Sequence, residues 1–227
     1  MDKRFLTILA AIVVIFGSIF IFSQRSSNSS GGSTLGSQTQ LTNHVRGQGQ
    51  KGVTLVEYGD FQCSACFSFE PVIKEVVEKY SNDIYFQFRN LPLVQLHPNA
   101  FAAARAAEAA SLQNKYWEMH DILYDSSNWQ TWTNSVNARI LFDSYAQKLG
   151  LNMEQFKQDY GSSKVNDAIN ADLAEFKKTR QPMSTPTFFL NGTYLDTSKL
   201  TDQNNRPSFE KFKVVLDAEI AKEPSRQ

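Results

Sequence analysis

Two cysteines, Cys63 and Cys66, constrain the fold of this chain more than any other feature of its sequence. They are the only cysteines among 227 residues, and two residues separate them. The apolar, β-branched run 53–58 precedes them and ends at Gly59-Asp60, as expected for a strand. Apolar residues recur at helical spacing over 67–80 after them. The pair is therefore predicted to lie between a strand and the start of a helix.

The remaining patterns predict an α/β fold with a helical insertion. A strand over 84–89 completes a strand-helix-strand unit, which is typical of parallel strands. Helices are predicted over 98–110, 115–124, 138–150, 153–160 and 164–178. Two strands, 187–190 and 193–195, then flank the turn Asn191-Gly192, and a helix over 208–222 follows. We expect residues 43–96 and 182–227 to form one body, interrupted by the insertion 97–181.

The first 42 residues differ in kind from the rest. An apolar run over 5–22 follows Lys3 and Arg4 and is close to the ~20 residues that cross a bilayer. We predict a single transmembrane helix over 1–22, a signal-anchor that leaves everything after it outside the cytoplasm. A cleaved signal peptide is the alternative, although the run ends without a convincing small-x-small site. Residues 23–42, rich in Ser, Gly, Gln and Asn, are predicted to be a flexible linker.

Charge and histidine placement narrow the classes of function. The 23 basic and 23 acidic residues cancel, so no field of one sign would attract nucleic acid. Half of a zinc site would share the spacing of the two cysteines, but His44, His97 and His120 are not paired at ligand spacing. A purely structural disulfide is the other alternative, although closing a four-residue loop constrains the unfolded chain little. We expect no metal and no cofactor other than a redox-active disulfide.

The position of the two cysteines predicts their chemistry. A sulfur at a helix N-terminus faces unpaired backbone N–H groups and the positive end of the helix dipole, which lower its pKa. Cys63 is therefore the expected nucleophile. Cys66, one turn further in, is expected to resolve the mixed disulfide from the buried side.

A second motif lies far along the chain, at Ser184-Thr185-Pro186-Thr187-Phe188-Phe189-Leu190-Asn191-Gly192. Taken alone, Pro186 could simply begin a strand, where sheets tolerate proline. Together with Asp60-Phe61-Gln62-Cys63-x-x-Cys66 and the helical insertion, however, the sequence resembles the DsbA-like thiol oxidases, in the branch with membrane-anchored Gram-positive members. The resemblance covers about residue 44 to the C-terminus and implies a thioredoxin-like fold with an inserted α-helical subdomain.

The resemblance also implies roles for individual residues. Pro186 would form a cis peptide bond against the disulfide, and Thr185 would offer backbone hydrogen bonds to a bound substrate strand. Ser64 and Ala65 would line the same substrate site. Glu57 would be the buried acid that relays protons to Cys66, and desolvation would raise its pKa. The alternative for Glu57 is an acid that faces outward at a strand edge.

Other polar segments have simpler interpretations. The segments 97–100 and 115–121 resemble the first residues and the aromatic face of the family's inserted helices, and we interpret both as packing of the insertion on the rest of the fold. Asp60 is interpreted as a turn or helix-capping residue. The dipeptide Ser64-Ala65 departs from the strongest oxidants of the family, which have a histidine there. We therefore expect a milder oxidant in which the helix start does most of the stabilising.

These observations predict an enzyme, a protein thiol-disulfide oxidoreductase at the cell membrane. It would donate its disulfide to reduced exported polypeptides and be reoxidised by a membrane quinone-linked oxidase of the DsbB or vitamin K epoxide reductase (VKOR) type. A reductase or isomerase of the same fold is the nearest alternative. A non-enzymatic copper or thiol carrier and an inactive interaction module are others. We expect a monomer.

Overall fold

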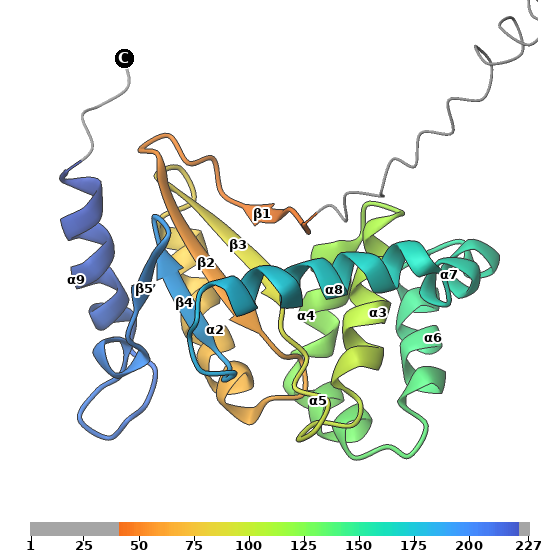
Figure 1. The fold of residues 1–227 in the computed structure, drawn as a ribbon. Helices are drawn as coiled ribbons and strands as arrows, with labels where there is room; N and C mark the ends of the chain where they lie inside the picture. The colour runs from red at the N-terminus through yellow and green to blue at the C-terminus, as the bar shows by residue number, and fades with distance from the viewer. Residues whose placement is uncertain (1–40, 223–227) are drawn as a thin grey trace, which may run out of the picture. The chain divides into compact units, whose positions relative to one another are not determined.

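A five-stranded sheet lies at the centre of residues 41–222, the part of the chain that a computed structural model describes (Figure 1). The strand order is β1-β3-β2-β4-β5. β2 and β3 are parallel, and the other pairs are antiparallel. The strands are β1 (His44–Arg46), β2 (Val53–Gly59), β3 (Ile84–Asn90), β4 (Thr187–Leu190) and β5 (Thr193–Leu195).

The unit β2-α2-β3 confirms the predicted strand-helix-strand pattern. Helix α2 spans Ser64–Lys79 and begins directly after Cys63. Its buried residues, which include Cys66, Phe69, Glu70 and Ile73, follow the three-to-four-residue spacing of one helix face. This face packs on the sheet, so the second cysteine is drawn into the core.

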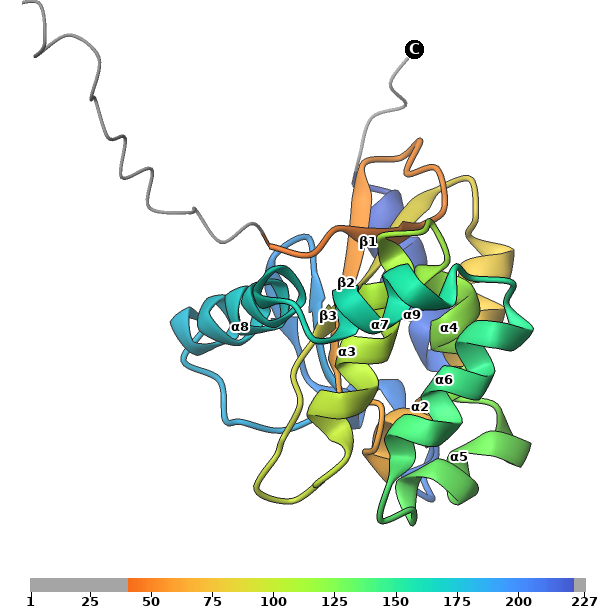
Figure 2. The same cartoon turned by 90° about the vertical axis from the view of Figure 1, so that its right-hand side faces the viewer.

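Six helices lie between β3 and β4, at the predicted position of the insertion. They are α3 (Ala100–Ser111), α4 (Tyr116–Leu123), α5 (Ser126–Thr133), α6 (Ala138–Lys148), α7 (Met153–Tyr160) and α8 (Ser163–Lys178). Figure 2 shows α3, α4, α6 and α7 gathered together, and α3 contacts each of the other three. α3 is lined with buried alanines, which allow helices to approach closely on several sides.

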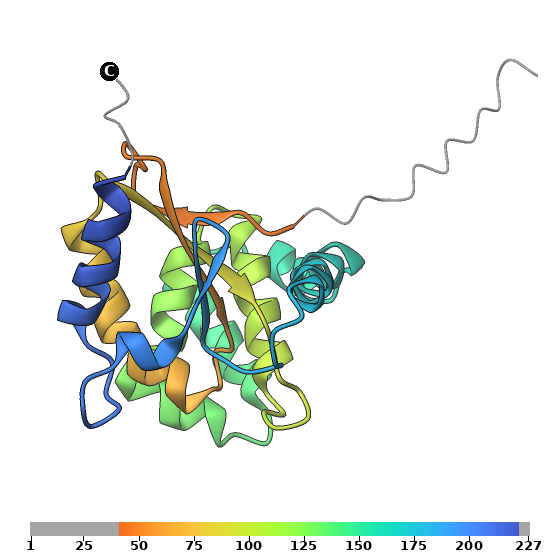
Figure 3. The ribbon, with the colours of Figure 1, turned by 60° about the vertical axis from the view of Figure 1, so that its left-hand side comes forward.

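The two faces of the sheet are covered by different helices (Figure 3). On one face, Phe69 of α2 and Phe212 of α9 (Phe209–Ile220) pack against Phe188 of β4. On the other face, Phe176 of α8 packs against Tyr58 of β2. β2 is thus buried on both sides, which explains why its sequence is a nearly continuous apolar run.

Three elements were not predicted from the sequence. β1 has only three residues and pairs with β3. α5 is capped by Asp125, whose side chain accepts a hydrogen bond from the Ser127 N–H. A short 3-10 helix, η1 (Thr197–Leu200), precedes α9.

The predicted transmembrane helix 1–22 lies outside the described residues. So do residues 23–40 of the predicted linker 23–42. Among the helices of residues 41–222, none is both long and apolar enough to cross a bilayer. Thr42, at the predicted end of the linker, is buried. Its backbone N–H and its hydroxyl both donate to the carboxylate of Asp172 in α8.

Candidate active site

Cys63 is the N-cap residue of α2. Its backbone is extended, with φ −71° and ψ 124°, and its N–H donates to the Asp60 carbonyl oxygen at 3.0 Å. Both cysteines are free thiols, so the geometry is that of the reduced protein. Cys66 is 1% exposed and Cys63 is 8% exposed, while Ser64 and Ala65 between them are exposed. The site therefore has an outer and an inner sulfur, as the sequence predicts.

Asp60 shapes the turn that leads into the cysteines. Its buried carboxylate accepts hydrogen bonds from the backbone N–H groups of Gln62 and Leu93, at 2.7 and 2.8 Å. His97 Nδ1 lies 2.7 Å from the same carboxylate. Of the two interpretations offered above, the structure supports the turn residue, because the cap position of α2 belongs to Cys63.

The segment before β4 approaches the outer sulfur. The Thr185-Pro186 peptide bond is cis, and the Cys63 Sγ lies 3.4 Å from the Thr185 carbonyl oxygen. A carbonyl can accept a hydrogen bond only from the thiol form. The Thr185 hydroxyl, by contrast, is buried without a partner among residues 41–222 and is free to donate to a thiolate. The structure thus brings together segments that are about 120 residues apart.

The two sulfurs differ in acidity. The hydrogen bond from the Cys66 thiol is the largest cause that lowers the pKa of Cys63 to about 5. Burial opposes this shift, while Thr185 and the backbone N–H groups of Cys66 and Ala65 assist it. Burial raises the pKa of Cys66 well above its ordinary value, and the same hydrogen bond raises it further. The helix start therefore contributes, but the inner thiol contributes more, which corrects the expectation that the helix start does most of the stabilising.

Glu57 lies inside the protein, and the outward-facing alternative is wrong. It occupies the central strand β2, is 3% exposed, and stands opposite Phe88 of β3. Burial raises its pKa, and the charges of Glu70 and Cys63 raise it further. Gly59 leaves room for this arrangement, because a Cβ there would lie 2.4 Å from the Phe88 ring and 3.2 Å from Glu57 Oε1.

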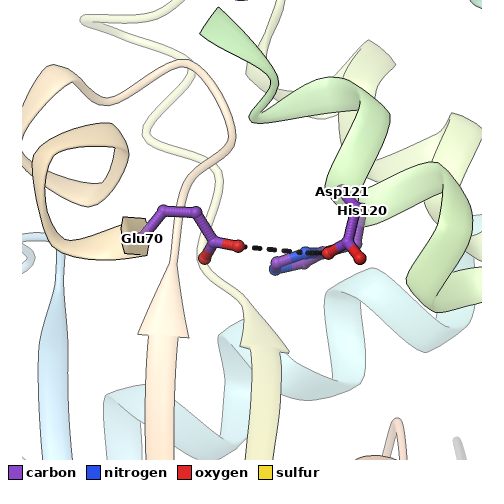
Figure 4. Close-up of side chains that lie close together, drawn as sticks. All are labelled: Glu70, His120 and Asp121. Atoms are coloured by element: carbon purple, nitrogen blue, oxygen red, sulfur yellow. Dashed lines mark hydrogen bonds and ion pairs between the residues drawn. The ribbon is translucent and has the colours of Figure 1, made fainter. Parts of the chain in front are cut away.

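Two buried ionisable residues beyond Glu57 were not identified as site residues from the sequence. Glu70 lies on α2, four residues after Cys66 and on the same buried face. His120 of α4 is also buried, and its Nδ1 lies 3.9 Å from Glu70 Oε1 (Figure 4). The four-residue spacing from Cys66 could have identified Glu70. No local signal could have identified its approach to His120, which lies 50 residues further along the chain.

Helix α5 holds the turn before the cysteines. Trp129 donates from Nε1 to the Phe61 carbonyl oxygen at 2.8 Å, and its ring stacks on Phe67 with centroids 4.5 Å apart. Gln62 donates from Nε2 to the Thr133 carbonyl oxygen at 2.9 Å. A helix of the insertion thus holds the backbone before Cys63 and packs on a side chain of α2 after it.

Comparisons with solved structures show the fold. A thioredoxin-like oxidoreductase from Silicibacter pomeroyi matches with a TM-score of 0.62 and 22% identity, over 84% of this chain and 97% of that one. The corresponding values for alpha-DsbA1 of Wolbachia pipientis are 0.63 and 21%, over 80% and 92%. BdbD of Bacillus subtilis in its oxidised form matches at 0.62 and 20%, over 79% and 93%.

Curated relatives share part of the sequence. The Na(+)/H(+) antiporter NhaA 1 of Mycolicibacterium vanbaalenii is 40% identical over 151 residues, which are 66% of this chain and 23% of the antiporter. The antiporter of the same name from Salinispora arenicola is 38% identical over 154 residues, 66% of this chain and 22% of that protein. The chain spans about a quarter of the length of the curated relatives it matches.

A family model described as thioredoxin matches residues 39–217. This range contains both cysteines, the cis proline and the whole helical insertion. The predicted thioredoxin-like α/β fold is therefore confirmed. The chain belongs to the thioredoxin family and has the fold of its DsbA-like thiol-disulfide oxidoreductases.

Proposed function

We propose that this protein is an oxidase that donates the Cys63–Cys66 disulfide to reduced exported polypeptides. The observation that carries the proposal is the asymmetry of the pair: Cys63 caps the start of α2, whereas Cys66 is buried behind it, and the pKa of the first is lowered while that of the second is raised. A Cys63 pKa of about 5 means that the reduced form is stabilised as a thiolate at neutral pH. A dithiol that is stabilised in its reduced form makes its disulfide a strong oxidant.

The exchange proceeds in two steps. A thiolate of the client attacks Cys63 Sγ, the Cys63–Cys66 bond breaks, and Cys66 leaves as a thiolate that takes up a proton. The second client thiol, after losing its proton, attacks the client sulfur of the mixed disulfide and releases the Cys63 thiolate. The client gains one disulfide, the enzyme gains two electrons, and one proton is released because Cys63 stays ionised.

The surrounding residues support each step. Glu57, buried and with a raised pKa, is the acid that protonates Cys66. Thr185 and Pro186 present backbone beside the outer sulfur, where an extended client segment can bind, and the exposed Ser64 and Ala65 complete that surface. The disulfide itself serves as the redox group, with no metal.

We infer that the enzyme acts outside the cytoplasm, as a monomer tethered by a single transmembrane helix over residues 1–22. Disulfides persist in oxidising compartments, which favours this location for a donor. A membrane oxidase of the DsbB or VKOR type is the proposed acceptor of its electrons. The apolar run and the basic residues before it support the anchor.

A redox titration against glutathione tests the direction of electron flow. We expect a reduction potential between those of the strong oxidants, about −120 mV, and protein disulfide isomerase, about −180 mV. A value near −270 mV, that of thioredoxin, would instead identify a reductase. A value near −180 mV combined with reshuffling of scrambled disulfides would identify an isomerase.

Trapping tests the chemistry separately. In Cys66→Ala, the Cys63 thiolate should attack a peptide that carries an S–S bond to a small thiol, break that bond and release the small thiolate, and the mixed disulfide should accumulate because the resolving sulfur is gone. The matched control is the double variant Cys63→Ala, Cys66→Ala, which should trap nothing. If the wild-type protein bound copper stoichiometrically and showed no disulfide turnover, its function would be that of a copper carrier and not of an enzyme.

A further inference from the structure

Three ionisable side chains that the proposed steps do not use lie together between α2 and α4 (Figure 4). His120 Nδ1 is 3.1 Å from Asp121 Oδ1 and 3.9 Å from Glu70 Oε1. The side chains of His120 and Glu70 are 1% and 5% exposed, whereas that of Asp121 is 38% exposed. The group therefore leads from the interior of the protein to its surface.

The inner end of this group lies on the buried face of α2 that also carries Cys66. Glu70 lies one helical turn beyond Cys66, and after burial its charge is the main cause that raises the pKa of Glu57. Glu70 Oε1 is buried and has no hydrogen bond within residues 41–222, although Lys74 Nζ lies 3.3 Å away. Glu70 Oε1 and His120 Nδ1 are 3.9 Å apart. A small side-chain rotation, or one bridging water molecule, would connect them by hydrogen bonds.

The outer end is a fixed anion. Arg46 of β1 donates to Asp121 Oδ2 at 2.6 Å. Burial alone would raise the pKa of Asp121, but hydrogen bonds from His120 and Arg46 lower it to about 2. Asp121 therefore stays ionised near neutral pH and accepts the hydrogen bond from His120 as a carboxylate.

Aromatic rings pack around the other sides of His120, and its Nε2 has no hydrogen bond within residues 41–222. The rings of Phe61, Phe88 and Trp117 pack around it, with centroids 5.0 to 5.5 Å away. Two tyrosines, one at each end of α4, complete the surroundings, and both have a raised pKa, chiefly because they are buried. They are Tyr116 and Tyr124. Tyr124 also donates its hydroxyl to the Asp60 carbonyl oxygen.

A divalent cation could also use this set of one imidazole and two carboxylates, whose nearest ligand atoms lie within 4.8 Å of one another. The surrounding charge argues against it. Arg46 already pairs with Asp121, and Lys74 already pairs with Glu70. A cation placed between these carboxylates would face two fixed positive charges.

We propose that Glu70, His120 and Asp121 form the route by which protons pass between Glu57 and the solvent during disulfide exchange. The inference rests on the proposed function, because only turnover requires such a supply. Cys66 takes the carboxyl proton of Glu57, Glu57 regains one through Glu70 from the His120 imidazolium, and the imidazole regains one from water at the Asp121 edge. No electrons move along the route. Cys66 and Glu57 are 1% and 3% exposed, so a route is needed.

The test compares the full-length wild-type protein with His120→Gln. We measure reduction of the Cys63–Cys66 disulfide by a dithiol peptide, and its reoxidation by oxidised glutathione, between pH 5.5 and 8.5. In His120→Gln we expect both rates to fall by about tenfold near pH 7, because glutamine cannot take up and release a proton, and the pH-rate profile to differ from that of the wild type. The equilibrium constant with glutathione should stay within about twofold, because a proton route changes rates alone.

His44→Gln is the matched control. His44 is also a partly buried imidazole that pairs with a carboxylate, Glu108, at 2.8 Å and stacks on the Tyr116 ring. It has no contact with Glu70. We expect its rates to stay within about twofold of wild type at each pH.

Added imidazole provides a second test. In His120→Gly, millimolar imidazole should restore much of the lost rate, while His44→Gly should not respond. Equal pH-rate profiles for wild type and His120→Gln would overturn the route. A fall in rate matched by an equal shift in the equilibrium constant would also overturn it, because that would be an electrostatic or structural effect. Failure of the wild-type protein to oxidise the peptide would instead defeat the proposed function.

Discussion

The outer and inner sides of the cysteine pair are surrounded by different kinds of chemical group. Around Cys63 the contacts come largely from backbone: the start of α2, the Thr185 carbonyl and the cis peptide bond before Pro186. Around Cys66 the groups are ionisable side chains, Glu57 and, beyond it, Glu70 and His120. This difference suits the two sulfurs to different roles. Cys63 is kept ionised at the outer side, whereas Cys66 is kept protonated beside groups that can supply protons.

Selective alkylation is the most direct way to break this comparison. At pH 7 Cys63, with a pKa of about 5, is almost fully thiolate, whereas Cys66 is protonated and buried. We expect iodoacetamide to modify Cys63 on the order of a thousandfold faster, combining ionisation and access. Peptide mass spectrometry of partly labelled protein gives the ratio. Comparable labelling of both cysteines in folded protein would remove the asymmetry on which the proposed function depends.

Glu57→Gln should slow the exchange reaction on the order of a hundredfold, because Cys66 would leave without its proton donor. Stopped-flow reduction of the disulfide by a dithiol peptide measures this rate. Glu57→Asp is a suitable partner variant, since it shortens the side chain but keeps the carboxyl group and should retain more activity. Equal rates for wild type and Glu57→Gln would show that the inner side plays no part in proton transfer.

The same variant should alter the pH dependence of stability. The pKa of Glu57 is raised in the folded state, so between the unfolded and folded pKa values the folded protein binds the extra proton. The free energy of unfolding of the wild type therefore falls as pH rises through this interval. We expect Glu57→Gln to exceed wild type by roughly 1 to 3 kcal/mol at pH 8, with the gap closing toward pH 4. Urea unfolding at several pH values tests this, and a constant gap would contradict it.

Gly59→Ala probes the packing between the two sides. The added Cβ would meet the Phe88 ring at 2.4 Å, so the ring and the Glu57 carboxyl must move. We expect a loss of about 1 to 2 kcal/mol in the free energy of unfolding, as is usual for overpacking. Gly161→Ala is the control, because its Cβ would meet only atoms at 3.7 Å or beyond. A similar, small effect at both positions would mean that the space beside Glu57 is loosely packed.

Thr185→Val gives the smallest expected change, on the outer side. Its hydroxyl assists the Cys66 thiol in lowering the pKa of Cys63, so its loss should raise that pKa by the equivalent of about 1 kcal/mol. Thiolate absorbance at 240 nm as a function of pH measures it. Thr185→Ser keeps the hydroxyl and should stay close to wild type. A lower pKa in Thr185→Val would show that the side chain favours the thiol.

Local patterns were sufficient for the outer side of the site. The run before Cys63 predicted β2, the apolar residues at helical spacing after Cys66 predicted α2, and the turn at Asn191-Gly192 placed β4 and β5. Each of these signals lies within about ten residues of chain. Their assembly into one sheet with a helical insertion followed from the order of elements.

The parts that were missed depend on distant contacts. β1 is a strand only because three residues pair with β3, and α5 has a polar sequence whose two tryptophans pack on other elements. Glu70 belongs to α2, before β3 in the sequence, and His120 belongs to α4, after it. Nothing in the sequence near either residue indicates that the two side chains approach each other. Contacts of this kind depend on how elements that are distant in the sequence pack together.

The contacts of β1 determine how much of the chain must be kept when the folded part is isolated. Thr42 hydrogen-bonds to Asp172, His44 pairs with Glu108, and Arg46 pairs with Asp121. A fragment trimmed to Val53 would still contain every strand and helix of the redox site, yet it would leave Asp172 and Glu108 buried beside missing partners. Each loss costs on the order of 1 to 3 kcal/mol. A shortened protein meant for biochemical work should therefore begin before Thr42.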